Sequence, residues 1–161
     1  MMLRDFSVLG AGSWGTAIAI LLAKNSKSPI HIWSREKEVA DCINQHNLNK
    51  KFLAEVKLHE LVVAETDIKK VVANIVFIAT PSQYVRLVLK KYLQASVKIN
   101  LEKKQLGFVI CSKGVELKTG YLISDVIAEL IPSSKIAVLS GPSFARPVAL
   151  GLPTAITLAS K

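Results

Sequence analysis

The sequence has few of the residues that would indicate an extracellular or metal-binding protein. Only two cysteines occur among 161 residues, Cys42 on a helical pattern and Cys111 at the end of an apolar strand pattern. These positions favour two reduced packing residues over a disulfide. The three histidines lack metal-ligand spacing with the cysteines or with one another, so we expect no metal site.

Long apolar runs are also missing. No run approaches the roughly 20 residues that a membrane-spanning helix requires. Residues 1–5 lead directly into a strand-like segment, without the apolar segment and small-residue cleavage site of a secretory signal. We therefore expect no membrane insertion and a cytoplasmic location. The length and the 50% hydrophobic composition suit one globular domain with a sizeable core.

Acidic residues are outnumbered, which gives a net charge of +9. Such a charge can indicate nucleic-acid binding. However, the lysines are scattered as short pairs, and basic residues do not alternate with aromatic ones as on a single-strand platform. We expect solvated surfaces that attract anionic ligands, and no nucleic-acid partner.

Short apolar segments alternate with segments of helical period along the chain. The expected strands are 6–9, 30–33, 61–63, 75–79, 107–110 and 135–139, with a further candidate at 155–159. The expected helices are 14–24, 36–46, 67–73, 80–92 and 119–130, and polar insertions are expected near 47–58 and 94–105. This alternation predicts an α/β fold with a doubly wound, mainly parallel sheet of the Rossmann type.

A glycine-rich segment follows the first expected strand. Gly10-Ala11-Gly12-Ser13-Trp14-Gly15 matches G-x-G-x-x-G and opens an apolar helix, which is the context that a dinucleotide-binding loop requires. Gly10 would allow the tight turn, Gly12 the approach of a pyrophosphate, and Gly15 the contact between helix and strand. The alternative is a glycine-rich turn that binds nothing.

The end of the second expected strand bears on the choice of cofactor. An NAD-binding protein usually has Asp or Glu there, whereas this sequence has Trp33-Ser34-Arg35. Arg35 could pair with a 2′-phosphate or lie on the adenine face, and Ser34 could add a hydrogen bond. We therefore predict that NADP is accepted at least as well as NAD. The alternative is that Arg35 pairs with Glu38 in the first turn of the next helix.

Further segments indicate a family. Ala79-Thr80-Pro81-Ser82-Gln83, Ser112-Lys113-Gly114, Leu139-Ser140-Gly141-Pro142-Ser143-Phe144-Ala145 and 151–155 follow the glycine loop in order. Together these segments resemble the bacterial NAD(P)-dependent sn-glycerol-3-phosphate dehydrogenases over nearly the whole chain. Other two-domain dehydrogenases, of the 6-phosphogluconate or hydroxyacid type, are disfavoured by the Ser-Gly-Pro-Ser-Phe-Ala segment.

The resemblance implies an enzyme that transfers hydride between NAD(P)H and dihydroxyacetone phosphate, giving glycerol 3-phosphate for phospholipid synthesis. It implies that Ser13, Trp14, Arg35 and Ala145 contact the cofactor. It further implies that Lys113 contacts both cofactor and substrate, and that Gly141 and Ser143 contact the substrate.

The positions and chemical groups of the three expected substrate residues suit a phosphorylated ligand. Lys113, Gly141 and Ser143 follow expected strands at the carboxyl edge of the sheet, where ligands bind. A lysine ammonium also suits a phosphorylated substrate. The alternatives are a solvated surface lysine for Lys113 and a helix or turn cap for Ser143. Thr80 and Gln83 are weaker candidates, because Thr80-Pro81 is explained by helix initiation alone.

The resemblance also implies a helical C-terminal domain that supplies the proton-transfer lysine, which we expect beyond residue 161. We interpret residues 1–161 as the dinucleotide-binding domain, with no catalytic residue of its own, and predict no turnover by this chain alone. A free-standing nucleotide-binding module is the alternative function, and the sequence leaves a homodimer open.

Overall fold

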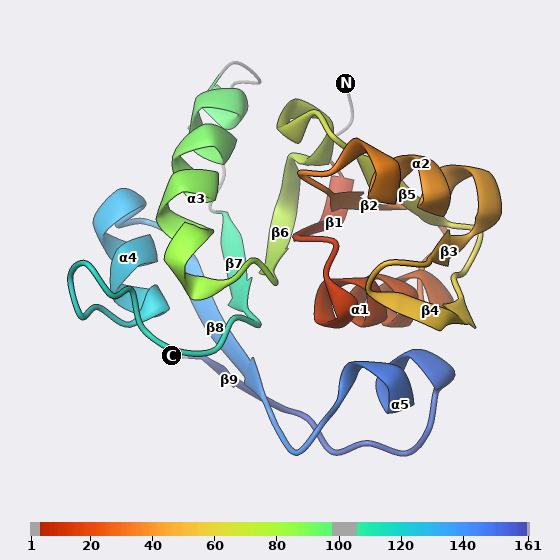
Figure 1. Ribbon diagram of the computed structural model, residues 1–161. Helices are drawn as coiled ribbons and strands as arrows, with labels where there is room; N and C mark the ends of the chain where they lie inside the picture. The colour runs from red at the N-terminus through yellow and green to blue at the C-terminus, as the bar shows by residue number, and fades with distance from the viewer. Residues whose placement is uncertain (1–3, 98–105, 161) are drawn as a thin grey trace.

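The computed structural model describes residues 4–97 and 106–160 and contains a seven-stranded sheet (Figure 1). Its strands lie in the order β5-β2-β1-β6-β7-β8-β9, and only β9 is antiparallel to its neighbour, β8. The strands are β1 (Arg4–Leu9), β2 (Ile30–Trp33), β5 (Val62–Glu65), β6 (Ala73–Ile78), β7 (Gly107–Ile110), β8 (Lys135–Ser140) and β9 (Thr157–Ser160). The prediction of a doubly wound, mainly parallel sheet is confirmed.

Helices cover both faces of the sheet, as Figure 1 shows for α1 and α3. One core joins the sheet to α1 (Ser13–Lys24), α2 (Lys37–His46) and α5 (Ala145–Leu150). The other joins it to the short 3-10 helix η1 (Ile68–Val71), α3 (Ser82–Val97) and α4 (Ile123–Leu130). Val8 and Leu9 are adjacent in β1 and both 0% exposed, yet they enter opposite cores. The central strands β6 and β7 are largely apolar, as expected for strands with both faces covered.

The expected insertion at 47–58 is a small antiparallel hairpin. It consists of β3 (Leu48–Asn49) and β4 (Leu53–Lys57), which form a separate two-stranded sheet. The other insertion was expected near 94–105. Its first residues, up to Val97, belong to α3, and residues 98–105 lie outside the described residues. The prediction of a short helix at 67–73 is confirmed in part. A helix capped by the Asp67 side chain is present, but it is a 3-10 helix, η1, that spans only Ile68–Val71.

Three elements differ from the prediction. The helix expected at 119–130 begins only at Ile123, because 115–122 form a turn closed by a bridge between Val115 and Leu122. Helix α5 was not predicted, since it has only six residues and contains Pro147. The last strand lies at 157–160 rather than 155–159.

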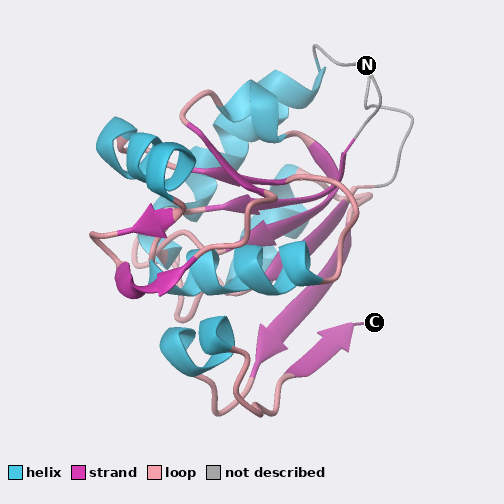
Figure 2. Cartoon of the chain, turned by 90° about the vertical axis from the view of Figure 1, so that its right-hand side faces the viewer, coloured by secondary structure: helices cyan, strands magenta, loops and turns pink. Residues whose placement is uncertain are grey.

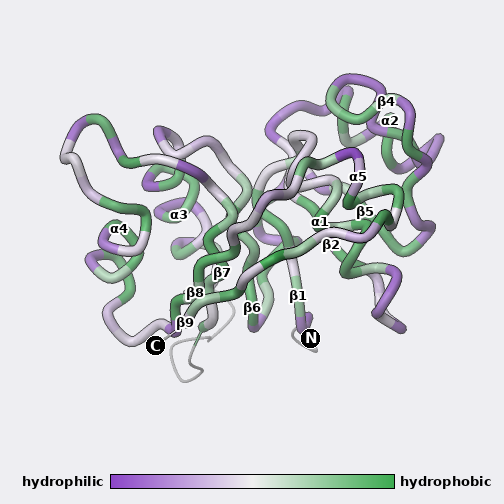
Figure 3. The backbone as a smooth tube through the Cα atoms, turned by 90° about the horizontal axis from the view of Figure 1, so that it is seen from below, coloured by the Kyte–Doolittle hydropathy of each residue, from purple (hydrophilic) through white to green (hydrophobic). Residues whose placement is uncertain are grey.

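One edge of the sheet is exposed and apolar. Figure 2 shows β8 and β9 side by side at this edge, with α5 in the connection between them. Val138 and Leu158 are exposed on these two strands, which Figure 3 shows beside each other, and Leu150 and Leu152 are exposed at the end of α5 and just after it. Within the described ranges, no helix has the length and hydrophobicity needed to cross a bilayer.

Candidate functional site

The glycine loop joins the end of β1 to α1 in a conformation that excludes side chains at two positions. Gly10 has a φ of +117°, and a Cβ atom there would lie 2.9 Å from the backbone of Ala79. A Cβ atom on Gly15 would lie 1.9 Å from the carbonyl oxygen of Gly10. Glycine is therefore required at both positions, as the turn and the helix-to-strand contact predict.

The N-terminus of α1 is open. Gly12 is its N-cap residue, no side chain caps it, and its first turn contains no acidic residue. A Cβ atom on Gly12 would meet nothing within 4 Å. The first N–H groups of a helix have no partner within the helix, and with the helix dipole they attract anions. The loop is therefore suited to a pyrophosphate, and the space above Gly12 leaves room for one.

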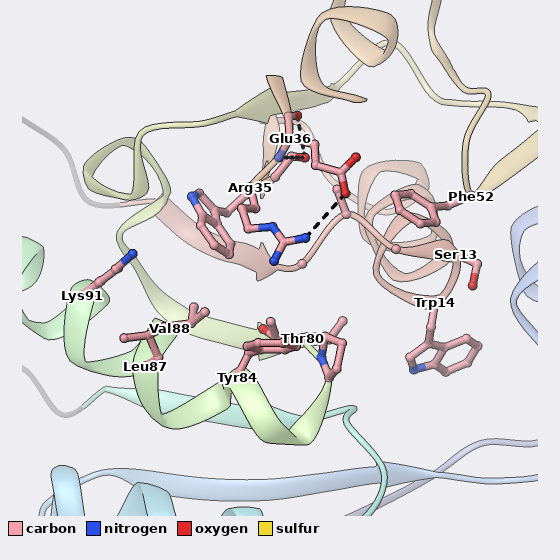
Figure 4. A pocket seen from close by; sticks show the side chains of 17 residues that line it. Ser13, Trp14, Arg35, Glu36, Phe52, Thr80, Tyr84, Leu87, Val88 and Lys91 are labelled. Carbon is pink, nitrogen blue, oxygen red and sulfur yellow. Dashed lines mark hydrogen bonds and ion pairs between the residues drawn. The ribbon is translucent and has the colours of Figure 1, made fainter. Parts of the chain in front are cut away.

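A cavity of about 440 Å³ lies over this loop (Figure 4). Its walls come from the ends of β1, β2 and β6, from the first turns of α3 and from the hairpin. They comprise Gly10, Ala11, Gly12, Ser13, Trp14, Trp33, Ser34, Arg35, Glu36, Phe52, Ala79, Thr80, Pro81, Tyr84, Leu87, Val88 and Lys91. A mostly apolar cavity of this size with a few polar groups is typical of a cofactor site.

Arg35 stands at the mouth of the cavity, with 74% of its side chain exposed. Its guanidinium lies 3.8 Å from the carboxylate of Glu36. The alternative prediction, that Arg35 pairs with Glu38, is therefore wrong, because the acidic partner is Glu36. The Ser34 hydroxyl donates to the Glu36 carbonyl and accepts from the Glu36 N–H group. Ser34 is thus engaged by the backbone instead of pointing to a ligand.

The predicted site residues fall into two groups. Gly10, Gly12, Ser13, Trp14 and Arg35 line the cavity, whereas Gly15 does not line it and packs closely against Gly10 of the same loop. Lys113, Gly141, Ser143 and Ala145 do not line it, although they follow β7 and β8 on the same carboxyl edge. The structure therefore brings together the residues expected at the adenine and pyrophosphate end.

Lys113 is exposed and forms no ion pair with any residue of 4–97 or 106–160. The loop that carries it is held against α3. Gln83 donates to the carbonyl of Val115 and accepts from the N–H group of Leu117, at 2.8 and 2.9 Å. Arg86 also bonds the Glu116 carboxylate, which lowers the pKa of that carboxyl group. The surroundings thus fix the loop and leave the ammonium free to meet an anion.

The segment after β8 is a tight turn. The N–H group of Ser143 donates to the carbonyl of Gly141 at 2.8 Å, and its hydroxyl lies 3.4 Å from the same oxygen. The N-cap of α5 is Phe144, so Ser143 caps a turn and not the helix. Ala145 begins α5 and packs partly buried against the core that α1 shares.

Sequence reasoning missed two parts of the cavity. One is the face of α3 formed by Tyr84, Leu87, Val88 and Lys91, whose helical spacing could have revealed it. The other is the hairpin, where buried Asn49 bonds the glycine loop and Phe52 lines the cavity. No sequence pattern indicated the hairpin contact.

Both cysteines are free, as predicted. Burial raises the pKa of the Cys111 thiol to about 12, so this thiol stays protonated at neutral pH. Within the described part of the chain, no three His, Cys, Asp or Glu residues form a group that could hold a metal ion.

Comparison with known proteins agrees with this geometry. Residues 5–161 match the family described as NAD-dependent glycerol-3-phosphate dehydrogenase N-terminus. The NAD(P)+ glycerol-3-phosphate dehydrogenase of Erythrobacter litoralis is 41% identical over 159 residues, which are 98% of this chain and 45% of that protein. The chain thus spans about half the length of the curated relatives it matches.

Solved structures give the same result. The glycerol-3-phosphate dehydrogenase of Coxiella burnetii is 30% identical, with a TM-score of 0.83 over 98% of this chain and 47% of that one. The Plasmodium falciparum enzyme is 28% identical, with a TM-score of 0.80 over 97% and 45%. This chain therefore belongs to the NAD-dependent glycerol-3-phosphate dehydrogenase family, to whose N-terminal part it corresponds.

Proposed function

We propose that this chain is the cofactor-binding half of a cytoplasmic oxidoreductase that interconverts dihydroxyacetone phosphate and sn-glycerol 3-phosphate for glycerophospholipid synthesis. The observation that carries the proposal is the uncapped N-terminus of α1, which opens beside Gly12 into the cavity lined by Arg35. An anionic dinucleotide fits this combination of free N–H groups, apolar walls and a guanidinium. The nicotinamide of the bound cofactor supplies or accepts the hydride.

In this proposal the glycine loop holds the cofactor by its backbone. The N–H groups of Ser13 and Trp14, in the first turn of α1, bind the pyrophosphate, while Gly10 and Gly15 allow the loop its shape. Arg35 binds a 2′-phosphate, so NADP is accepted at least as well as NAD. Ala145 contacts the cofactor near its nicotinamide end.

The substrate end of the site lies along the edge formed by β7 and β8. Lys113 contacts both cofactor and substrate, and its ammonium attracts the phosphate of dihydroxyacetone phosphate or glycerol 3-phosphate. Gly141 and Ser143 offer a backbone amide and a hydroxyl. Reduction of a ketone also needs a proton donor. We assign that role to a lysine beyond residue 161, so residues 1–161, as a dinucleotide-binding domain, bind cofactor without turnover.

The test has two arms. Calorimetric titration of the chain with NADPH should show saturable binding at one site, and absence of binding would overturn the proposal. Addition of dihydroxyacetone phosphate should then cause no NADPH oxidation by this chain, whereas the product of the whole reading frame should oxidise NADPH. Binding without oxidation by that product would favour the second candidate, a nucleotide-binding module. The proposal requires no metal ion, so a chelator should leave binding unchanged, and it leaves a homodimer open.

A further inference from the structure

The mouth of the cavity holds an acidic residue between two cations. Glu36 lines the cavity, and its side chain is 30% exposed. Its carboxylate lies 3.8 Å from the Arg35 guanidinium and forms an ion pair and hydrogen bond with the ammonium of Lys51. Figure 4 shows the Arg35 and Glu36 side chains turned towards each other. The arginine expected to bind a 2′-phosphate therefore already faces an anion of the chain.

Lys51 is held in place by the hairpin. It lies in the turn between β3 and β4, two residues after Asn49, whose buried amide bonds the glycine loop. Asn49 also accepts a hydrogen bond from the N–H group of Phe52 at 3.2 Å, which fixes this turn. The Lys51 ammonium lies 5.3 Å from the centroid of the Phe52 ring, which lines the cavity. The second cation does not line the cavity itself, but it contacts two residues that do, Glu36 and Phe52.

We propose that Glu36 sets the balance between NAD and NADP, because its carboxylate occupies the cations Arg35 and Lys51 that a 2′-phosphate would otherwise use. This inference rests on the proposed function. The phosphate of NADP must displace the carboxylate and then sits beside its negative charge, which weakens binding. The ribose hydroxyls of NAD can instead donate to that carboxylate. Glu36 therefore favours NAD, and the two cations favour NADP.

The decisive substitution is Glu36→Gln, which keeps the shape of the side chain and removes its charge. Trp14 and Trp33 are the two tryptophans of the chain and both line the cavity, so tryptophan fluorescence reports binding. We expect Glu36→Gln to tighten NADP+ about tenfold and to leave NAD+ equal or weaker. The matched control is Glu38→Gln, an acidic residue in the first turn of α2 that does not line the cavity. It should change the ratio of the two dissociation constants less than about twofold.

Lys51 gives the reciprocal test. Lys51→Gln should weaken NADP+ about five- to tenfold with little effect on NAD+, and Lys50→Gln, the neighbouring exposed lysine, should change neither. An unchanged ratio in Glu36→Gln, in a chain that binds both cofactors, would overturn this inference alone. Binding of neither cofactor by the unsubstituted chain would overturn the proposed function and this inference with it.

Discussion

The side-chain amide of Asn49 donates a hydrogen bond of 2.9 Å to the main-chain carbonyl of Ala11, 38 residues earlier in the chain. The same amide donates to the hydroxyl of Thr16 at 2.8 Å, and Asn49 is 0% exposed. The β3–β4 hairpin, which lies outside the main sheet, is therefore tied to the glycine loop by these hydrogen bonds. Because these groups are buried, their hydrogen bonds cannot be replaced by water.

Asn49→Ala should destabilise the fold and loosen the loop. Removing one partner leaves the Ala11 carbonyl unpaired, which costs about 1–3 kcal/mol of unfolding free energy. Cofactor affinity should fall as well, because the loop N–H groups are no longer held for the pyrophosphate. Urea unfolding and cofactor titration measure the two effects. Asn44→Ala is the control, since Asn44 makes two hydrogen bonds to the backbone of Ala64 away from the cavity. Equal loss of affinity in both variants would contradict this account of Asn49.

Two glycine substitutions should separate folding from binding. Gly12→Ala adds a methyl group to open space at a φ of −72°, so the thermal midpoint should change little. The methyl group occupies the space proposed for the pyrophosphate, and cofactor affinity should fall at least about tenfold. Gly15→Ala instead places a Cβ atom against the carbonyl of Gly10 and should prevent stable folding. Tight cofactor binding by a folded Gly12→Ala variant would show that the pyrophosphate lies elsewhere.

Stability should fall as the pH drops below about 6.5, the usual pKa of histidine. Burial, and then the positive charge of Arg4, lower the pKa of His31 in the folded state, against the opposing effect of Glu65. Between the folded and unfolded pKa values the unfolded chain binds more protons, so protonation favours unfolding. Urea unfolding from pH 7.5 to 5.5 should show the decline, and His31→Gln should reduce it. If stability declines by the same amount in His31→Gln, the decline comes from groups other than His31 and the prediction is contradicted.

The ion pairs of Arg86 should make the stability of the fold depend on pH in the acidic range, below the range in which His31 titrates. Its hydrogen bonds lower the pKa of both Glu116 and Glu129. Their contribution to stability is present above the ordinary carboxyl pKa of about 4.3 and is lost as the pH falls through the lowered values. Arg86→Met should lower the thermal midpoint more at pH 7 than at pH 3. An equal loss at both pH values would indicate a role in packing alone.

The thiols should differ in reactivity. Cys111 is buried with a pKa of about 12, so little thiolate forms at pH 8. Cys42 is only partly buried. Ellman's reagent should therefore modify Cys42 in the native chain and both thiols in urea. Fast reaction of both in the native chain, checked with Cys42→Ser, would contradict the burial of Cys111.

The sequence was informative where local chemistry determines structure. The short apolar segments between helical patterns predicted every strand of the main sheet, and the glycine spacing predicted the β1–α1 loop because Gly10 and Gly15 have no room for side chains. Contacts between distant segments were not predictable. Asn49 and Lys51 lie in a polar stretch without periodicity, and only the fold brings them to the loop and to Glu36. Pro147 likewise obscured α5, which is stabilised by packing on α1 rather than by propensity.

The most direct test of the central claim, that the cavity over the glycine loop binds NAD(P), is calorimetric titration of the chain with NADPH and with NADH. We predict saturable binding at one site, with NADPH at least as tight as NADH, and a large loss of affinity for NADPH in Arg35→Ala. No saturable binding of either dinucleotide, or binding of NADPH unaffected by both Gly12→Ala and Arg35→Ala, would contradict the claim.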